Sequence, residues 1–202
     1  MSGAVDPLPW VVGVGASGVE GIRDLEDFLA AWPPRTDASL LVVLHRPAEA
    51  SSILPHLLQR RASVPVIVPH QDDPVRAGVC YVGLPAAHLT IDDSGRIRLL
   101  ADGAFRNRTI DLLFKSVAGF AGPHAVGIVL SGSLDDGARG AHAIRHAGGL
   151  VGIVTPTSSV TRQMPQSVLE MDGPVAFHGK PADPAAEIAR NIATRREQIA
   201  AP

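Results

Sequence analysis

Short apolar segments alternate with amphipathic segments along most of the chain. Segments such as 40–44 (LLVVL) and 125–130 (AVGIVL) contain no polar residue, which is typical of parallel strands covered by helices on both faces. The amphipathic segments between them have the apolar spacing of surface helices. The pattern predicts strands at 10–15, 39–44, 64–68, 79–83, 88–91, 96–100, 125–130 and 150–154, and helices at 18–31, 51–61, 109–120, 137–147, 165–171 and 184–199.

Prolines and turn residues refine this pattern. The first helix should end before Pro33, because proline cannot continue a helix, and the last should begin at Asp183 as an N-cap followed by Pro184. The segment 64–100 contains consecutive short strands, and the turn residues 92–95 (DDSG) predict a hairpin there. We therefore predict an α/β fold: a doubly wound, mostly parallel sheet with helices on both faces and an antiparallel hairpin excursion.

Length and composition restrict the functions open to this fold. The 202 residues suit a single domain over 1–202, and 46% hydrophobic residues suffice for a core. A formal net charge of −2 argues against nucleic acid as the main partner. Cys80, the only cysteine, rules out an internal disulfide and a multi-cysteine zinc site, and its apolar neighbours favour a buried, inert thiol. We recognise no signal peptide and no membrane-spanning stretch, so we expect a cytoplasmic protein that is not inserted in a membrane.

The glycine-rich segment 11–21 (VVGVGASGVEG) has two functional interpretations. From Gly13 to Gly18 its glycines follow the Gly-x-Gly-x-x-Gly spacing of a dinucleotide-binding loop. Such a loop requires an acidic residue at the end of the second strand to bind the ribose hydroxyls, and this chain has His45 there. Arg46 next to it is suited to the 2′-phosphate of NADP, so the cofactor alternative is weakened but stays open.

The second interpretation is a serine hydrolase, which needs a nucleophile, a base and an acid in one crevice. Strand ends supply Ser17, His45 and either Asp135 or Asp136, and the carboxyl ends of parallel strands meet at one edge of a sheet. Each residue has a structural alternative: Ser17 and Asp136 could cap the helices that follow them, and His45 could bond to the backbone. Together they favour a catalytic site, in which the acid accepts the Nδ1 proton of the histidine and N–H groups at the helix N-terminus face an oxyanion.

Two further histidines, His142 and His146, lie four residues apart on a predicted helix. This spacing can bind zinc, but no third ligand lies between them. We therefore predict an ordinary helix face and no metal site.

A series of short motifs occurs in a fixed order between about Val11 and Gly173. They are Gly15-Ala16-Ser17, His45-x-Pro47, Tyr81-Val82 with Pro85 and His88, Asn107-Arg108, Asp111-x-Leu113-Phe114-x-Ser116, Ala125-Val126-Gly127, Ser131-Gly132, Asp136-Gly137-Ala138-x-Gly140 and Met164-Pro165. In this order they resemble the catalytic domain of the chemotaxis protein-glutamate methylesterases. Those bacterial enzymes hydrolyse glutamyl methyl esters on chemoreceptor helices.

The resemblance implies a role for each candidate residue. Ser17 would be the nucleophile, His45 the general base and Asp136 the orienting acid, with Asp135 a solvated loop residue. It further implies methylated glutamates on cytoplasmic chemoreceptor helices as substrates, glutamine deamidation as a related reaction, and no metal or organic cofactor. The other residues expected at the substrate or oxyanion site are Gly18, Ser133, Arg46, His88 and Met164, the first two through backbone N–H groups.

The chain departs from the family pattern at the rim of the expected site. Gly18 stands where threonine is usual, Arg46 where methionine is usual, and Ser133-Leu134 where the family has Met-Gly. These changes keep two alternatives open, a small-ester hydrolase with a divergent substrate and a non-catalytic interaction module of the same fold. Most family members also carry an N-terminal receiver domain. We expect a stand-alone form without it, for which a separate receiver protein would be a candidate regulator.

Overall fold

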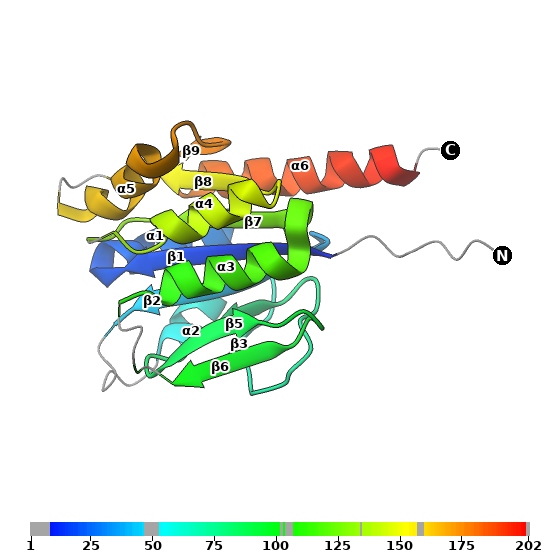
Figure 1. The fold of residues 1–202 in the computed structure, drawn as a ribbon. Helices are drawn as coiled ribbons and strands as arrows, with labels where there is room; N and C mark the ends of the chain where they lie inside the picture. The colour runs from blue at the N-terminus through cyan, green and yellow to red at the C-terminus, as the bar shows by residue number, and fades with distance from the viewer. Residues whose placement is uncertain are drawn as a thin grey trace.

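The computed structural model describes residues 9–46, 53–101, 103, 107–133, 135–156 and 160–200. In this part of the chain, seven strands form a parallel sheet in the order β3-β4-β2-β1-β7-β8-β9, and β5 and β6 form a separate antiparallel pair (Figure 1). The strands are β1 (Trp10–Ser17), β2 (Ala38–His45), β3 (Val66–Ile67), β4 (Cys80–Val82), β5 (Ala87–Ile91), β6 (Ile97–Ala101), β7 (Ala125–Val129), β8 (Leu150–Val154) and β9 (Phe177–Gly179). The helices are α1 (Gly18–Ala31), α2 (Leu54–Gln59), α3 (Thr109–Ala121), α4 (Ala138–His146), α5 (Gln163–Asp172) and α6 (Ala182–Ala200), with short 3-10 turns at Gly122–His124 and Val160–Arg162.

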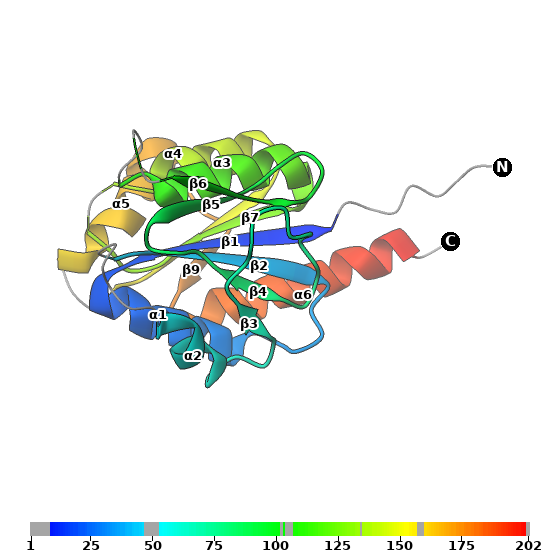
Figure 2. The same ribbon diagram turned by 90° about the horizontal axis from the view of Figure 1, so that it is seen from below.

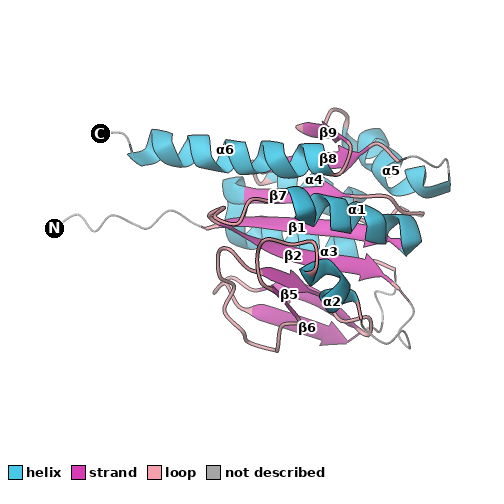
Figure 3. Cartoon of the chain, turned by 180° about the vertical axis from the view of Figure 1, so that it is seen from behind, coloured by secondary structure: helices cyan, strands magenta, loops and turns pink. Residues whose placement is uncertain are grey.

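Helices cover both faces of the parallel sheet. Helices α1, α2 and α6 lie on one side of the sheet, and α3 and α4 lie on the other (Figure 2). Side chains of α1, α2 and α6 share one apolar cluster with one face, and side chains of α3, α4 and α5 share another with the opposite face. Figure 3 shows α1, α2 and α6 in front of the sheet, with α3 behind it. The β5–β6 pair packs against α3. The predicted doubly wound α/β fold with a hairpin excursion is confirmed.

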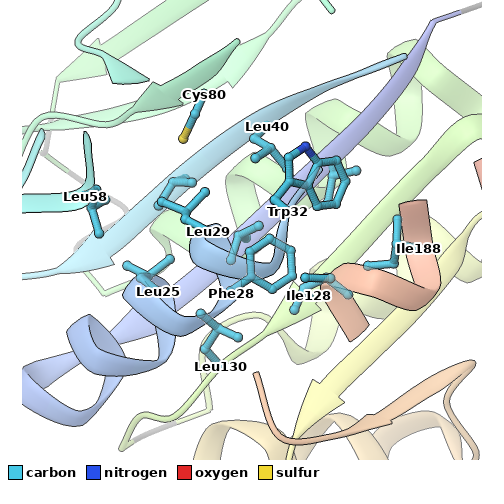
Figure 4. Packing of buried hydrophobic residues seen from close by; sticks show 14 of the residues in the cluster. Leu25, Phe28, Leu29, Trp32, Leu40, Leu58, Cys80, Ile128, Leu130 and Ile188 are labelled. Atoms are coloured by element: carbon cyan, nitrogen blue, oxygen red, sulfur yellow. The ribbon is translucent and has the colours of Figure 1, made fainter. Parts of the chain in front are cut away.

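Alternate residues of the central strands face opposite clusters, which explains their uninterrupted apolar sequences. In β1, Val12 belongs to the cluster under α1 and Val11 to the cluster under α3. Phe28 of α1 and Trp32, the residue that follows α1, stack on each other and fill the first cluster near Ile188 of α6 (Figure 4). Each such fully buried side chain contributes about 1.5–3 kcal/mol to folding.

The strand order reverses at β1. The chain adds β2 and β4 on one side of β1 and β7, β8 and β9 on the other. In open α/β sheets, ligands bind outside the carboxyl ends of the strands at this reversal. A ligand site is therefore expected at the carboxyl end of β1, at the left in Figure 1.

All eight predicted strands and six predicted helices are present, with corrections at particular places. The segment 64–100 divides: β3 and β4 join the parallel sheet, and only β5 and β6 form the hairpin around the 92–95 turn. Helix α6 begins at Ala182, not after an N-cap at Asp183, because the Asp183 carboxylate accepts the N–H of Lys180 in the turn before it. Strand β9 was not predicted. Residues 51 and 52 of the expected second helix lie outside the described residues.

Candidate functional site

Close packing of α3 against β1 explains the first two glycines of segment 11–21. Gly13 and Gly15 lie inside β1 and not in a loop after it. A Cβ atom at Gly15 would overlap the Ile110 side chain, and one at Gly13 would come 3.0 Å from Phe114. A dinucleotide loop needs its glycines at the turn from strand to helix, where the backbone approaches the phosphates. Only Gly18, with φ of +70°, lies at that turn, so the structure disfavours the dinucleotide interpretation.

Ser17 is the last residue of β1 and the N-cap of α1. Its backbone is extended, with φ −145° and ψ 139°, and its N–H donates to the Ser131 carbonyl at 3.0 Å. The Ser17 hydroxyl forms no capping hydrogen bond with α1. Helix capping therefore does not account for this side chain, which is half-buried at the carboxyl end of the strand.

His45 is the last residue of β2 and the register partner of Ser17. Its Nε2 lies 2.6 Å from Oδ2 of Asp136. This corrects the expectation that Nδ1 of His45 faces Asp136: the aspartate contacts Nε2, and Nδ1 is not its partner. No hydrogen bond joins the Ser17 hydroxyl to the His45 ring, although both residues are described. Such contacts are often long before substrate binds.

Asp136 is fully buried and accepts three hydrogen bonds. Besides His45, the N–H groups of Ile110 and Asp111 donate to its carboxylate at 2.8 and 2.9 Å. These two amides belong to the first turn of α3, where the helix dipole also stabilises a negative charge. Asp136 therefore caps α3 and not α4, the helix that it precedes, because tertiary packing brings the N-terminus of α3 to it.

Asp135 and Asp136 have different environments, as expected. The Asp135 side chain is 59% exposed and pairs with Arg108 at 3.2 Å, whereas the Asp136 side chain is 1% exposed. Only Asp136 contacts His45. Among the two aspartates, Asp136 is the one placed to orient the imidazole.

The loop after β7 lies directly against Ser17. A Cβ atom at Gly132 would lie 2.8 Å from Cβ of Ser17 and would overlap Sδ of Met164. Ser133 follows in the same loop, and Leu134 lies outside the described residues. Met164 is 0% exposed, and its N–H donates to the Gly132 carbonyl at 3.1 Å. It therefore supports the loop from inside, which corrects its expected place on the substrate surface.

Arg46 and His88 differ in how they could meet a ligand. Arg46 is half-buried, and its Nη2 donates to the Gly83 carbonyl at 2.9 Å, just beyond the end of β4. Burial lowers the pKa of this guanidinium, and its Nε is buried without a hydrogen-bond partner. His88 is only 3% exposed and pairs with Leu100 across the β5–β6 hairpin. We place Arg46 at the rim of the site and His88 inside the hairpin packing, which corrects its expected place on the substrate surface.

The CheB methylesterase family model matches residues 12–188. The chain belongs to the CheB methylesterase family. Two relatives carry the name protein-glutamate methylesterase/protein-glutamine glutaminase. The one from Pectobacterium atrosepticum is 32% identical over 168 residues, which are 80% of this chain and 47% of the relative. The one from Rhodopseudomonas palustris, numbered 3, is 30% identical over 167 residues, which are 80% and 45%.

The chain spans about half the length of the curated relatives that it matches. Among solved structures, the catalytic domain of Thermotoga maritima CheB methylesterase superimposes with a TM-score of 0.78 and 23% sequence identity. The match covers 93% of this chain and 98% of that domain. At this identity the likeness shows that the two share a fold.

Two acidic residues near the candidate site were given no role from the sequence: Asp24 was not singled out, and Asp111 was named only as part of a motif. Asp24, on α1, accepts the N–H of Ser131 at 2.9 Å and so ties the loop after β7 to α1; burial raises its pKa. Asp111, on α3, accepts the N–H groups of Gly137 and Gly140, and burial, with the nearby charge of Asp136, raises its pKa. The available signal was a charged residue on a helix with a mainly apolar sequence, as for Asp111. The groups that donate to Asp24 and Asp111 lie on other elements, so the sequence alone does not identify them.

The remaining candidates lie outside this site. Cys80 is 0% exposed, and burial raises the pKa of its thiol to about 12, as expected for an inert thiol. His142 and His146 are exposed on α4 with ring centroids 6.2 Å apart. Within the described residues, no group of three or more His, Cys, Asp or Glu side chains could hold a metal ion. No described helix has the length and apolar character needed to cross a membrane.

Proposed function

We propose that this chain is a serine hydrolase that removes methyl groups from glutamyl methyl esters of bacterial chemoreceptors. One observation carries the proposal: Ser17 and His45 are register partners, and His45 is hydrogen-bonded to the buried Asp136. Membership of the CheB methylesterase family and the names of its relatives support the substrate. The proposed location is the cytoplasm, where receptor helices carry these esters.

In the proposed mechanism, Asp136 accepts a hydrogen bond from Nε2–H of His45 and holds the ring in one tautomer. Nδ1 of His45 then takes the proton of the Ser17 hydroxyl as Oγ attacks the ester carbonyl. The carbonyl oxygen becomes an oxyanion, which N–H groups near Gly18 and Ser133 and the N-terminal end of α1 would stabilise. Collapse of this intermediate transfers the proton to the departing methoxide, and methanol leaves an acyl-Ser17 ester.

The second half-reaction reverses these roles. His45 removes a proton from water, the resulting hydroxide attacks the acyl carbonyl, and Ser17 regains its proton as glutamate is released. The same steps would deamidate a glutamine, with ammonia in place of methanol. The glutaminase part of the relatives' names supports this second activity.

The proposal is tested by labelling the purified protein with a fluorophosphonate and assaying hydrolysis of p-nitrophenyl acetate and of a methylated chemoreceptor fragment. We expect labelling at Ser17 and release of methanol from the fragment. Ser17→Ala should abolish both and change the melting temperature little, because the hydroxyl makes no capping bond. Retained hydrolysis in Ser17→Ala would overturn the assignment of Ser17 as the nucleophile. Absence of both labelling and hydrolysis in the unchanged protein would overturn the proposal in favour of a non-catalytic interaction module.

A second candidate is a small-ester hydrolase with a divergent substrate. Arg46 favours it, because this cation lies beside His45 where the family usually has methionine. Turnover of p-nitrophenyl acetate without release of methanol from receptor fragments would support this candidate. A separate receiver protein remains a proposed regulator, tested by adding acetyl phosphate with such a protein to the assay.

A further inference from the structure

Asp111 and Asp136 cap each other's helices. The Asp136 carboxylate accepts the N–H groups of Ile110 and Asp111 in the first turn of α3. In return, Oδ1 of Asp111 accepts the N–H groups of Gly137 at 3.1 Å and Gly140 at 2.8 Å, at the start of α4. Neither helix receives a capping bond from its own N-cap side chain. The first turn of α3 is therefore capped by Asp136, which lies just before α4, and the start of α4 is capped by Asp111 of α3.

Packing leaves Asp111 little freedom to move from this position. A Cβ atom at Gly140 would lie 3.0 Å from Cα of Asp111 and 2.6 Å from Cβ of Phe114, so the two helices meet at backbone contact. Asp111 is 3% exposed, and its Oδ2 lies 3.5 Å from Nη1 of Arg108. That guanidinium offsets the second buried negative charge. Because it is buried, Asp111 offers no surface to a substrate.

The Gly137 amide is the link between Asp111 and the candidate active site. It belongs to the peptide bond that directly follows Asp136, and Gly137 itself has φ of +101°, a left-handed conformation. A hydrogen bond to this amide fixes the peptide plane beside Asp136 and, through it, the direction of the Asp136 side chain. A shift of about 1 Å in a catalytic group can lower a rate by about 10²-fold.

We propose that Asp111 is a positioning residue that holds the Asp136–Gly137 peptide so that Oδ2 of Asp136 stays within hydrogen-bond distance of His45. The effect on turnover rests on the proposed function. The effect on the His45–Asp136 hydrogen bond does not.

The test compares Asp111→Ala, which removes the Oδ1 atom that accepts from both amides, with Asp111→Asn, whose Oδ1 can still accept from both. The matched control is Ser116→Ala, which also removes two side-chain hydrogen bonds from α3, those to Leu113 and Ile91. Proton NMR follows the Nε2–H of His45, which a short bond to a buried carboxylate shifts downfield; its absence in His45→Gln assigns it. Kinetics on p-nitrophenyl acetate and thermal melting complete the measurements.

We expect Asp111→Ala to lose or broaden the downfield resonance and to lower kcat by about 10- to 100-fold with little change in KM. Asp111→Asn should keep the resonance and most of the turnover, and Ser116→Ala should keep both. If Asp111→Ala does not fold, Asp111→Ser takes its place, because its shorter side chain cannot reach both amides. An unchanged resonance in the alanine or serine variant, or an equal loss of turnover in Ser116→Ala at equal loss of melting temperature, would overturn the proposal. An inactive unchanged protein that fails to label would overturn the proposed function, while the NMR comparison still decides the role of Asp111.

Discussion

Ser17 and His45 are paired residues of two adjacent parallel strands, and each is the last residue of its strand. Paired residues of parallel strands project to the same face of a sheet. The hydrogen bonding of β1 to β2 therefore places the candidate nucleophile beside the candidate base without help from a loop. Only the acid comes from a loop, and the two-helix arrangement of α3 and α4 holds it.

The first prediction separates the two adjacent aspartates. Asp136→Asn should lower kcat by about 10³–10⁴-fold. A neutral amide does not stabilise the imidazolium, and its NH2 group, when it faces Nε2 of His45, favours the tautomer protonated on Nδ1, which cannot act as the base. Asp135→Asn should lower kcat by less than about fivefold, since it removes only an exposed ion pair with Arg108. Steady-state kinetics on p-nitrophenyl acetate measure both variants. Equal small effects would leave at most a Ser17–His45 pair in the mechanism.

A second prediction concerns Gly132, for which Gly119 provides a control. Gly132→Ala should cost about 1–3 kcal/mol of stability, because the added methyl group collides with Met164 and crowds Ser17. Turnover should fall by at least about tenfold as Ser17 is displaced. Gly119→Ala, on the exposed side of α3 with open space around the new Cβ, should instead stabilise the protein by about 0.5–1 kcal/mol. Chemical denaturation and kinetics test both; full activity in Gly132→Ala would show that the loop is free to adjust.

A third prediction follows from burial of the Cys80 thiol. Its pKa is raised to about 12, so the folded state keeps a proton that the unfolded chain releases above its ordinary pKa of about 8.5. The free energy of unfolding should therefore fall as pH rises from about 9 to about 12, by up to about 1.4 kcal/mol per pH unit from this group. Cys80→Ala should lower stability at neutral pH and show a shallower decline at alkaline pH. Urea denaturation at several pH values measures the two slopes, and parallel slopes would contradict the assignment.

The hydrophobic pattern was sufficient to predict the fold and to place Ser17 and His45 at one edge of the sheet, whereas the choice of Asp136 over Asp135 came from the family resemblance. Apolar runs that end in polar residues marked the ends of β1 and β2, and the shared edge of a parallel sheet then brought Ser17 and His45 together. Strand β9 was not predicted, because it is only three residues long and has a single buried side chain, Phe177. Its pairing with β8 depends on tertiary contacts, so the hydrophobic pattern of these residues gives almost no indication of a strand.

The errors at the site have the same origin. Asp136 caps α3, and Asp111 caps α4, so neither partner lies in the segment where a local capping rule would search for it. Which nitrogen of the His45 ring Asp136 contacts depends on how the loop after β7 is packed. Met164 packs against that loop at Gly132. These relationships depend on the crossing of helices, which residue spacing does not encode.

The last prediction concerns Arg46, the charged residue at the rim of the proposed site. A cation held beside His45 by the Gly83 carbonyl should favour ester substrates with a nearby acidic group. Arg46→Met should therefore raise KM for an acidic methyl-ester peptide by about two- to fivefold, the range of a partly exposed charge pair, with kcat unchanged. It should leave p-nitrophenyl acetate turnover unaffected, and added salt should raise KM for the peptide in the unchanged protein but not in the variant. Arg35→Met, in the loop before the amino end of β2 and so at the opposite end of the sheet, is the control. A loss of turnover on the neutral ester as well would mean that Arg46 supports the position of His45 through Gly83, and that it does not select the substrate.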